Sequence, residues 1–252
     1  MAVIVPHMEI LMAVKAQSED EVSIASPSKL LLLLEGRVFA EFGSMMLALP
    51  WLRKLPRGDG QPVMLIPGFG TSDAAMQPMR RLLQILGYKV YGWNQGRNLG
   101  MRKGMREKLS AHLHDIHLRH DDRKVNLIGW SLGGVFAREM ARAEPDLVRR
   151  VITLGSPFNG HPSANNVDGL FRFANRKNPP KLDWAGFQRR RTPPPVPCTA
   201  IYSKTDGVVA WQCSLEEEAP NTENVEVFSS HFGLGVNPQV LKVVAERLAK
   251  TD

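Results

Sequence analysis

Short apolar runs alternate with segments of helical period along most of the chain, from residue 62 onward. Each apolar run has the length of a buried strand, and the segments between them repeat their apolar residues every three or four positions. This alternation is typical of parallel strands joined by helical crossovers, so the pattern predicts an α/β fold. The predicted strands are Pro62–Pro67, Lys89–Trp93, Lys124–Gly129, Arg150–Leu154, Thr199–Ser203 and Asn224–Phe228, and the predicted helices are Met76–Leu86, Arg106–His120, Gly133–Ala143 and Gln239–Lys250.

The segment before the first predicted strand has a different pattern. Its longest apolar stretch, Leu30–Leu52, contains Glu35, Arg37 and Glu41, and each charge is costly at the centre of a bilayer. The stretch therefore predicts an amphipathic helix on the surface of the domain, with peripheral docking on a membrane as the alternative. Met1–Val14 is apolar but lacks a basic start and a cleavage site, so we expect no secretory signal and a cytoplasmic location.

Residues 157–197 interrupt the alternation and are rich in asparagine, proline and arginine. This composition predicts an insertion on the rim of the sheet, which is either a functional lid or a disordered loop. Its aromatic side chains either line a pocket or pack the insertion onto the body; they are Phe171, Phe173, Trp184 and Phe187.

Composition excludes several classes of protein. Hydrophobic residues make up 43% of the chain and charged residues 23%, as in ordinary globular domains. The formal net charge of +7 attracts anionic partners, but the basic residues are too dispersed to indicate nucleic-acid binding. Cys198 and Cys213 lie in no CxxC or Cys/His cluster, so we expect neither a zinc site nor a disulfide framework, and a single bridge between them stays open.

The strongest chemical motif is Gly129-Trp130-Ser131-Leu132-Gly133, which has the pattern G-x-S-x-G. It lies between a predicted strand and a predicted helix, where a tight turn projects the serine hydroxyl outward. Glycine at positions 129 and 133 removes the side chains that would collide in this turn. The motif predicts Ser131 as a nucleophile, with an ordinary glycine-rich turn as the alternative.

A nucleophilic serine needs a base, normally histidine. Of the seven histidines, His231 is the best placed because it follows a predicted strand and precedes the last helix. His161 is a lesser alternative that would reverse the expected order of the residues. Four further histidines lie on one predicted helix, where they form either a solvated face or a metal-ligand face: His112, His114, His117 and His120. The sequence contains no HExxH motif, and we expect no metal.

The histidine in turn needs an acid that fixes its tautomer. Asp206 follows the fifth predicted strand and precedes Gly207, so its carboxylate lies on a turn. With Ser131 before it and His231 after it, Asp206 completes the order Ser, Asp, His. Two weaker candidates, Asp168 and Asp183, fall in the insertion.

The negative charge that develops on an attacked carbonyl oxygen requires backbone N–H donors. One donor is expected from Leu132, directly after the nucleophile. The second is expected from Phe69, in the loop Pro67-Gly68-Phe69-Gly70 that follows the first predicted strand.

These motifs together resemble the α/β-hydrolase superfamily, in particular its small lipase and esterase members. The resemblance covers about residues 60 to 250 and implies an eight-stranded, mostly parallel sheet with a cap at residues 157–197. It divides the chain into an N-terminal helical extension, residues 1–60, and a hydrolase domain, residues 61–252. Proline at position 67, where many relatives carry histidine, and the extension itself depart from the family pattern.

The resemblance implies a serine ester hydrolase that acts without a cofactor on short- or medium-chain esters. An acyltransferase or a thioesterase would use the same triad, and a noncatalytic binding protein would keep the fold without the reaction. A fourth alternative is an anionic-surface binder that uses the basic residues of the insertion: Arg172, Arg176, Lys177 and Arg189 to Arg191.

Overall fold

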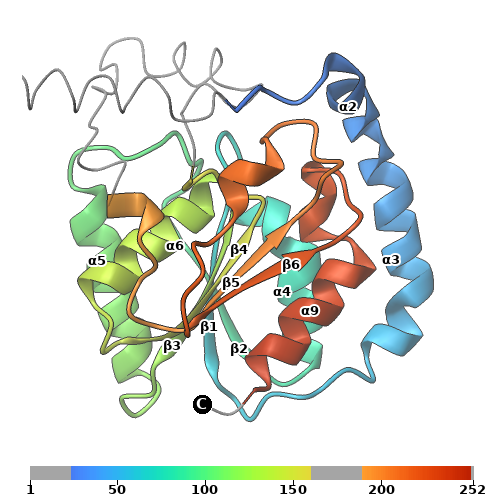
Figure 1. Cartoon of the computed structure of the whole chain (residues 1–252). Coiled ribbons are helices and arrows are strands. Elements are labelled where there is room, and N and C mark those ends of the chain that lie inside the picture. The colour runs from blue at the N-terminus through green and yellow to red at the C-terminus, as the bar shows by residue number, and fades with distance from the viewer. Residues whose placement is uncertain (1–23, 160–188, 251–252) are drawn as a thin grey trace, which may run out of the picture.

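Six parallel strands form the centre of the molecule (Figure 1). The computed structural model describes residues 24–159 and 189–250. The strands lie in the order β2-β1-β3-β4-β5-β6, and every neighbouring pair is parallel. They are β1 (Pro62–Ile66), β2 (Lys89–Gly92), β3 (Val125–Trp130), β4 (Val148–Leu154), β5 (Cys198–Tyr202) and β6 (Thr222–Glu226). Each predicted strand overlaps an observed one, which confirms the α/β class.

Helices cover both faces of the sheet, as parallel strands require. On one face lie α4 (Gln77–Ile85), which continues the 3₁₀ helix η2 (Asp73–Met76), and α9 (Pro238–Leu248). On the other lie α5 (Met105–Leu118) and α6 (Leu132–Ala143). Each layer encloses its own buried cluster, with Met79, Leu83, Val240 and Leu241 in the first and Leu109, Leu113, Phe136 and Ala137 in the second. All four predicted helices are thus confirmed.

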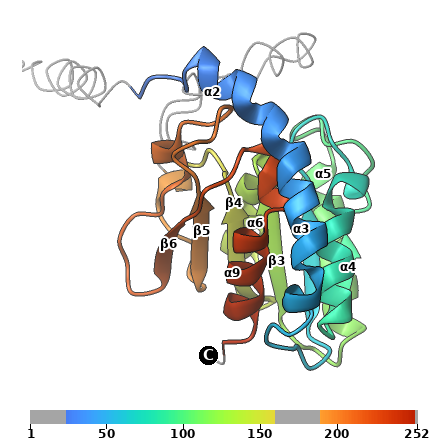
Figure 2. The same ribbon diagram turned by 90° about the vertical axis from the view of Figure 1, so that its right-hand side faces the viewer.

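The N-terminal segment adds a further helical layer outside α4 and α9 (Figure 2). It consists of α2 (Lys29–Leu33), the 3₁₀ helix η1 (Leu34–Arg37) and α3 (Val38–Leu52). Met45 and Leu52 of α3 are buried in the same cluster as α4 and α9. The segment directly before β1 is therefore helical, and the described residues form six strands rather than the eight that the resemblance implied.

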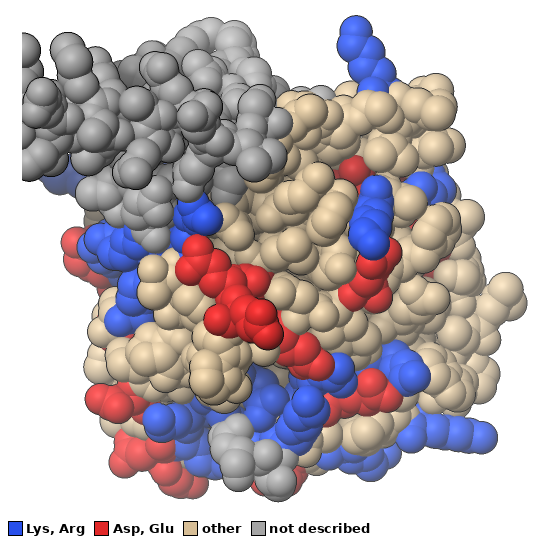
Figure 3. Space-filling view, in the orientation of Figure 1, with Lys and Arg blue, Asp and Glu red and all other residues tan. Residues whose placement is uncertain are grey.

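The outward side of α2 and α3 exposes large apolar side chains, and the edge of the molecule over α3 carries few charged residues (Figure 3). Leu33 is 78% exposed, Phe39 83% and Leu47 86%, whereas the charged Glu35 is buried. The predicted surface position of this helix is confirmed, but the helix does not turn a charged side to solvent as an amphipathic surface helix normally does. Within the described residues, no helix has both the length and the apolar character that crossing a bilayer requires.

The predicted insertion at 157–197 lies mostly outside the described residues, which end at 159 and resume at 189. Both flanks contact Arg138 of α6, which is 1% exposed and pairs with the buried Glu216 beyond the 3₁₀ helix η3 (Trp211–Ser214). The Arg138 guanidinium lies 3.8 Å from the centroid of the Phe158 ring and donates a 2.8 Å hydrogen bond to the Arg190 carbonyl. The two ends of the insertion are therefore tied to the helix that follows Ser131.

Candidate active site

Ser131 occupies the tight turn between β3 and α6, at the carboxyl edge of the sheet. Its backbone has φ 52° and ψ −123°, a conformation that costs energy in any residue with a Cβ. A Cβ on Gly129 would lie 2.3 Å from the Gly134 Cα, and a Cβ on Gly133 would lie 2.2 Å from the Ile66 carbonyl oxygen. Only glycine fits at these two positions, so the turn has the geometry that the G-x-S-x-G pattern predicted.

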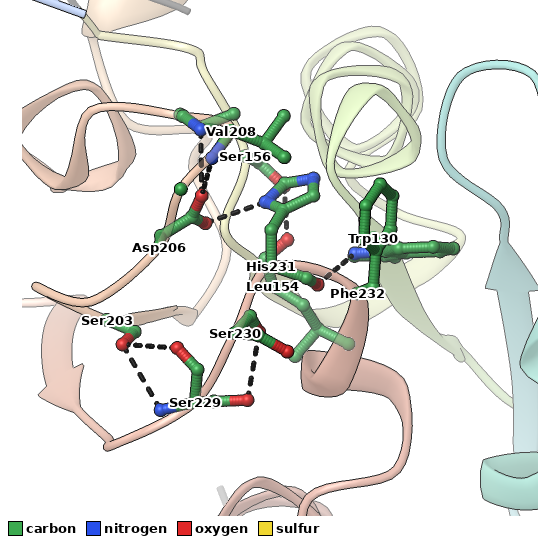
Figure 4. Close-up of polar contacts among 12 residues, drawn as sticks. Trp130, Leu154, Ser156, Ser203, Asp206, Val208, Ser229, Ser230, His231 and Phe232 are labelled. Atoms are coloured by element: carbon green, nitrogen blue, oxygen red, sulfur yellow. Dashed lines mark hydrogen bonds and ion pairs between the residues drawn. The ribbon is translucent and has the colours of Figure 1, made fainter. Parts of the chain in front are cut away.

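Asp206 and His231 are directly hydrogen-bonded to each other (Figure 4). Asp206 lies in the loop after β5, and His231 lies directly before the 3₁₀ helix η4 (Phe232–Gly235). The His231 Nδ1 is 2.6 Å from one carboxylate oxygen of Asp206. The other oxygen accepts hydrogen bonds of 2.8 Å from the backbone N–H groups of Val208 and Val209. These two donors fix the carboxylate, which in turn fixes the imidazole ring with Nε2 left for another partner.

The turn of Ser131 lies beside this pair. The Ser131 N–H donates to the Leu154 carbonyl, and a Cβ on the next residue, Gly155, would lie 3.0 Å from the Asp206 Oδ2 and 3.2 Å from the His231 Nδ1. Trp130 donates from Nε1 to the His231 carbonyl at 3.1 Å (Figure 4). In the described part of the chain, the Ser131 hydroxyl makes no hydrogen bond. A missing hydrogen bond of this kind does not argue against a nucleophile, because catalytic hydrogen bonds often form fully only when substrate binds.

The loop after β1 lies against Ser131, as the order of the strands requires. β1 pairs with β3 so that Ile66 faces Gly129, and a Cβ on Gly68 would lie 3.3 Å from the Ser131 Cβ. Phe69 follows Gly68, and Leu132 begins α6, where the first N–H groups have no partner within the helix. Both predicted oxyanion donors are therefore on segments that border Ser131.

Asn98 holds this loop in place, although no motif pointed to it. The residue is fully buried; its side-chain amide donates to the Pro67 carbonyl at 2.7 Å, and its backbone carbonyl accepts from the Gly70 N–H at 2.6 Å. The only signal in the sequence is an asparagine in a glycine-rich loop after β2, which is also ordinary for a turn.

A family model described as the alpha/beta hydrolase fold matches residues 61–184. This match and the parallel sheet with helices on both faces show that the chain has the α/β-hydrolase fold. Two triacylglycerol lipases, from Pseudarthrobacter phenanthrenivorans and Burkholderia plantarii, are each 31% identical to the chain over 119 residues. These matches cover 44% of this chain but only 37% and 33% of the two lipases. The solved monoacylglycerol lipase of Paleococcus ferrophilus has the same fold, with a TM-score of 0.57 at 16% identity over 77% of this chain and 96% of that one.

His231 is 2% exposed, and burial alone would lower the pKa of its imidazole. The charge and hydrogen bond of Asp206, together with the charge of Glu35, outweigh burial, so the pKa of His231 lies above its ordinary value of 6.5. Both carboxylates therefore favour the protonated form of the His231 imidazole.

Glu35 is a neighbour of the site that sequence reasoning did not identify. One oxygen of this buried carboxylate accepts hydrogen bonds from the backbone N–H groups of Gly207, at 2.7 Å, and His231, at 2.9 Å. The other oxygen accepts from the Phe232 N–H at 3.0 Å. A signal did exist in the sequence: Glu35 interrupts an apolar run in which a charge is useful only when it faces a partner.

Several of the alternative site residues cannot be compared with this arrangement. His161, Asp168, Asp183 and the aromatic and basic side chains of the insertion up to position 188 lie outside the described residues. The three histidines of α5 and His120, which lies just beyond it, make local contacts. His112 contacts the Gly92 carbonyl, His114 contacts Glu144, His117 contacts the Arg123 carbonyl and His120 contacts the Tyr91 hydroxyl.

The two cysteines are buried, free thiols in this fold. Burial raises the pKa of Cys198 and of Cys213 to about 11, so both stay protonated near neutral pH and are poor nucleophiles. The single bridge that the sequence left open is therefore not formed.

Proposed function

We propose that this chain is a serine carboxylic-ester hydrolase that acts through an acyl-enzyme. The observation that carries the proposal is the 2.6 Å hydrogen bond between His231 and Asp206, formed beside the strained turn that presents Ser131. This is the arrangement by which an otherwise weak serine hydroxyl becomes a nucleophile.

In the proposed reaction, the Ser131 Oγ attacks the ester carbonyl while the His231 Nε2 accepts the hydroxyl proton. The Asp206 carboxylate holds the proton on Nδ1 and stabilises the imidazolium. The N–H groups of Phe69 and Leu132 stabilise the oxyanion, and His231 then protonates the leaving alcohol. Water attacks the acyl-enzyme with the same histidine as base, which releases the acid and restores Ser131.

Two features support an ester as the substrate. The curated relatives are triacylglycerol lipases, and the sequence around the nucleophile lies within the matched part of the chain. We assign short- or medium-chain esters, because an insertion confined to 157–197 within the domain of residues 61–252 is a small cap for a long acyl chain. The segment 1–60 is then an addition to this domain.

A chain-length series of p-nitrophenyl esters, from acetate to palmitate, tests the assignment. We expect the highest kcat/KM between acetate and octanoate, and a mass increase equal to the acyl group on the peptide that contains Ser131 when turnover is quenched with acid. Fastest hydrolysis of palmitate would reject the chain-length assignment, and labelling of no serine would reject the acyl-enzyme.

An acyltransferase or thioesterase is the second candidate, since both chemistries use the same serine acyl-enzyme. Addition of a long-chain alcohol distinguishes an acyltransferase from a hydrolase, and replacement of the ester by a thioester distinguishes a thioesterase from an esterase. Hydrolysis is favoured if water remains the main acceptor when alcohol is present in excess.

A further inference from the structure

Charged side chains of the N-terminal helices contact both loops that carry the proposed acid and base. The structure assigns Glu35 a positioning role: its carboxylate holds the Asp206 loop and the His231 loop at a fixed separation. The role rests on the proposed ester hydrolysis, and it belongs to a segment outside the part of the chain that the family model matches.

Glu35 bridges the loops through their backbones. Its carboxylate is 4% exposed and accepts three N–H hydrogen bonds, from Gly207, His231 and Phe232. A carboxylate is costly to remove from water unless donors such as these replace the water, so the three hydrogen bonds compensate for the burial of Glu35. Gly207 follows Asp206 directly, and one Glu35 oxygen therefore joins the neighbour of the acid to the base itself.

Two further side chains extend the same contact. Arg37 donates hydrogen bonds to the carbonyl oxygen, at 2.6 Å, and the hydroxyl, at 2.8 Å, of Thr205. Glu41 accepts from the Ser230 N–H at 2.8 Å and from the Ser230 hydroxyl. The residues directly before Asp206 and directly before His231 are thus bound to the same helices as Gly207 and His231.

Glycine in each loop makes this close approach feasible. A Cβ on Gly207 would lie 2.3 Å from the Leu31 carbonyl oxygen, and a Cβ on Gly233 would overlap the Glu41 carboxylate. Neither glycine has a positive φ, so backbone conformation does not require glycine at these positions. Glycine is required there because any side chain would collide with the N-terminal helices.

The bridge also affects the charge of the base. The charged groups that face His231 or its loop are Asp206 from the β5 loop and Glu35, Arg37 and Glu41 from the N-terminal helices. Asp206 and Glu35 both raise the pKa of His231 against the effect of burial. Loss of the Glu35 charge therefore shifts the pKa of His231, whereas loss of a purely structural contact would not.

Glu35→Gln tests this role, with Glu107→Gln on the exposed side of α5 as the matched control. Glutamine keeps one acceptor oxygen but points an N–H toward the Phe232 N–H. We expect kcat for p-nitrophenyl butyrate to fall about tenfold or more with little change in KM, since a displacement of about 1 Å can cost about 100-fold. We also expect the acid limb of kcat/KM, which reports deprotonation of His231, to start above 6.5 in the wild type and to shift to lower pH in Glu35→Gln.

Gly207→Ala supplies a second variant that keeps all charges. Its added methyl group would press the Asp206 loop away from Leu31, whereas alanine at Gly36, with nothing within 4 Å, is the control. We expect Gly207→Ala to lower kcat without moving the acid limb. The positioning role alone would be overturned if Glu35→Gln kept the wild-type kcat and the wild-type acid limb of kcat/KM while Ser131→Ala lost turnover. Full turnover in Ser131→Ala would overturn the proposed function instead.

A separate observation concerns the opposite side of the same helices. The outward face of α2 and α3 exposes large apolar side chains without an intervening charge, which a helix facing water normally avoids. These side chains are Leu30, Leu33, Leu34, Phe39, Phe42, Met46, Leu47 and Trp51, and they are defined here as the apolar face. Exposed basic residues lie at both ends of it, Lys29 before and Arg53 and Lys54 after.

We propose that the apolar face docks on an anionic lipid surface. The opposite side of α3 packs on the body of the protein through the buried Met45 and Leu52, so the helix is suited to lying in the interface of a bilayer and not to crossing it. A second copy of the chain is a poorer partner, because antiparallel pairing brings Lys29 against Arg53, and parallel pairing brings Arg53 against Arg53. Anionic headgroups attract these same ends.

Vesicle co-sedimentation tests this face. We expect binding to vesicles of phosphatidylcholine and phosphatidylglycerol, weaker binding to phosphatidylcholine alone, and a loss of about tenfold or more in the double variant Phe39→Ser/Leu47→Ser. Leu118→Ser, at the 68% exposed end of α5, is the control and should bind as the wild type does. Equal binding by the double variant would overturn the proposal. So would a dimer in analytical ultracentrifugation that Phe39→Ser/Leu47→Ser converts to monomers, because the occupant would then be a second copy.

Discussion

Ser131→Ala is expected to lower kcat for p-nitrophenyl butyrate by about 10⁴- to 10⁶-fold. Neither cysteine thiol can replace the hydroxyl, because both are buried and protonated. Alanine keeps the Cβ that already occupies the strained turn at φ 52°, so the strain and the packing of the turn stay the same. Steady-state kinetics with the purified variants measures the loss.

A fluorophosphonate probe supplies a second readout for this variant. Its phosphorus reacts with an activated serine, so the wild type should be labelled at Ser131 and the alanine variant should remain unlabelled. Ser44→Ala, on the exposed side of α3, is the matched control and should retain both turnover and labelling. A melting temperature within a few degrees of the wild type excludes unfolding as the cause. Wild-type turnover in Ser131→Ala would refute the nucleophile assignment.

The strands and their crossover helices could be predicted because their pattern is local and redundant. β3, for example, is buried along its whole length, so its apolar run reads as a strand without knowledge of its neighbours. The outward face of α3 could not be predicted, because the same apolar run fits a helix buried on either side. Which side faces the protein depends on Glu35 and Glu41 meeting donors more than 150 positions away.

The candidate site was predicted unevenly for a related reason. Ser131 sits in a short motif whose glycines are required by contacts within a few residues and with β1, so the motif is visible in the sequence. Asp206 and His231 were found only through their order along the chain and their position after strands. Asn98 and Glu35 act through backbone groups of loops that are distant in the sequence, and a backbone N–H or carbonyl does not reveal which side chain it meets.

Asp206→Asn is expected to lower kcat by about 10⁴-fold while keeping the shape of the site. The oxygen that accepts from Val208 and Val209 remains when the carboxylate becomes an amide. The amide nitrogen then takes the place of the oxygen that faces His231 Nδ1 and donates a hydrogen where the carboxylate accepted one. His231 must respond with the tautomer that carries its proton on Nε2, and a protonated Nε2 cannot accept a proton from Ser131.

The tautomer can be measured directly. In the wild type, the His231 Nδ1–H bonded to Asp206 should give a low-field proton resonance in the NMR spectrum, and this resonance should disappear in Asp206→Asn. The pKa of His231 should also fall, since the carboxylate that raises it is lost. A lower pKa leaves more neutral histidine at pH 7, so a rate controlled only by the fraction of neutral base would rise. A fall in kcat together with a fall in that pKa therefore identifies the misplaced proton as the cause. Asp115→Asn, on the exposed surface of α5, should change none of these quantities, and an Asp206→Asn variant with wild-type kcat would show that another group orients His231.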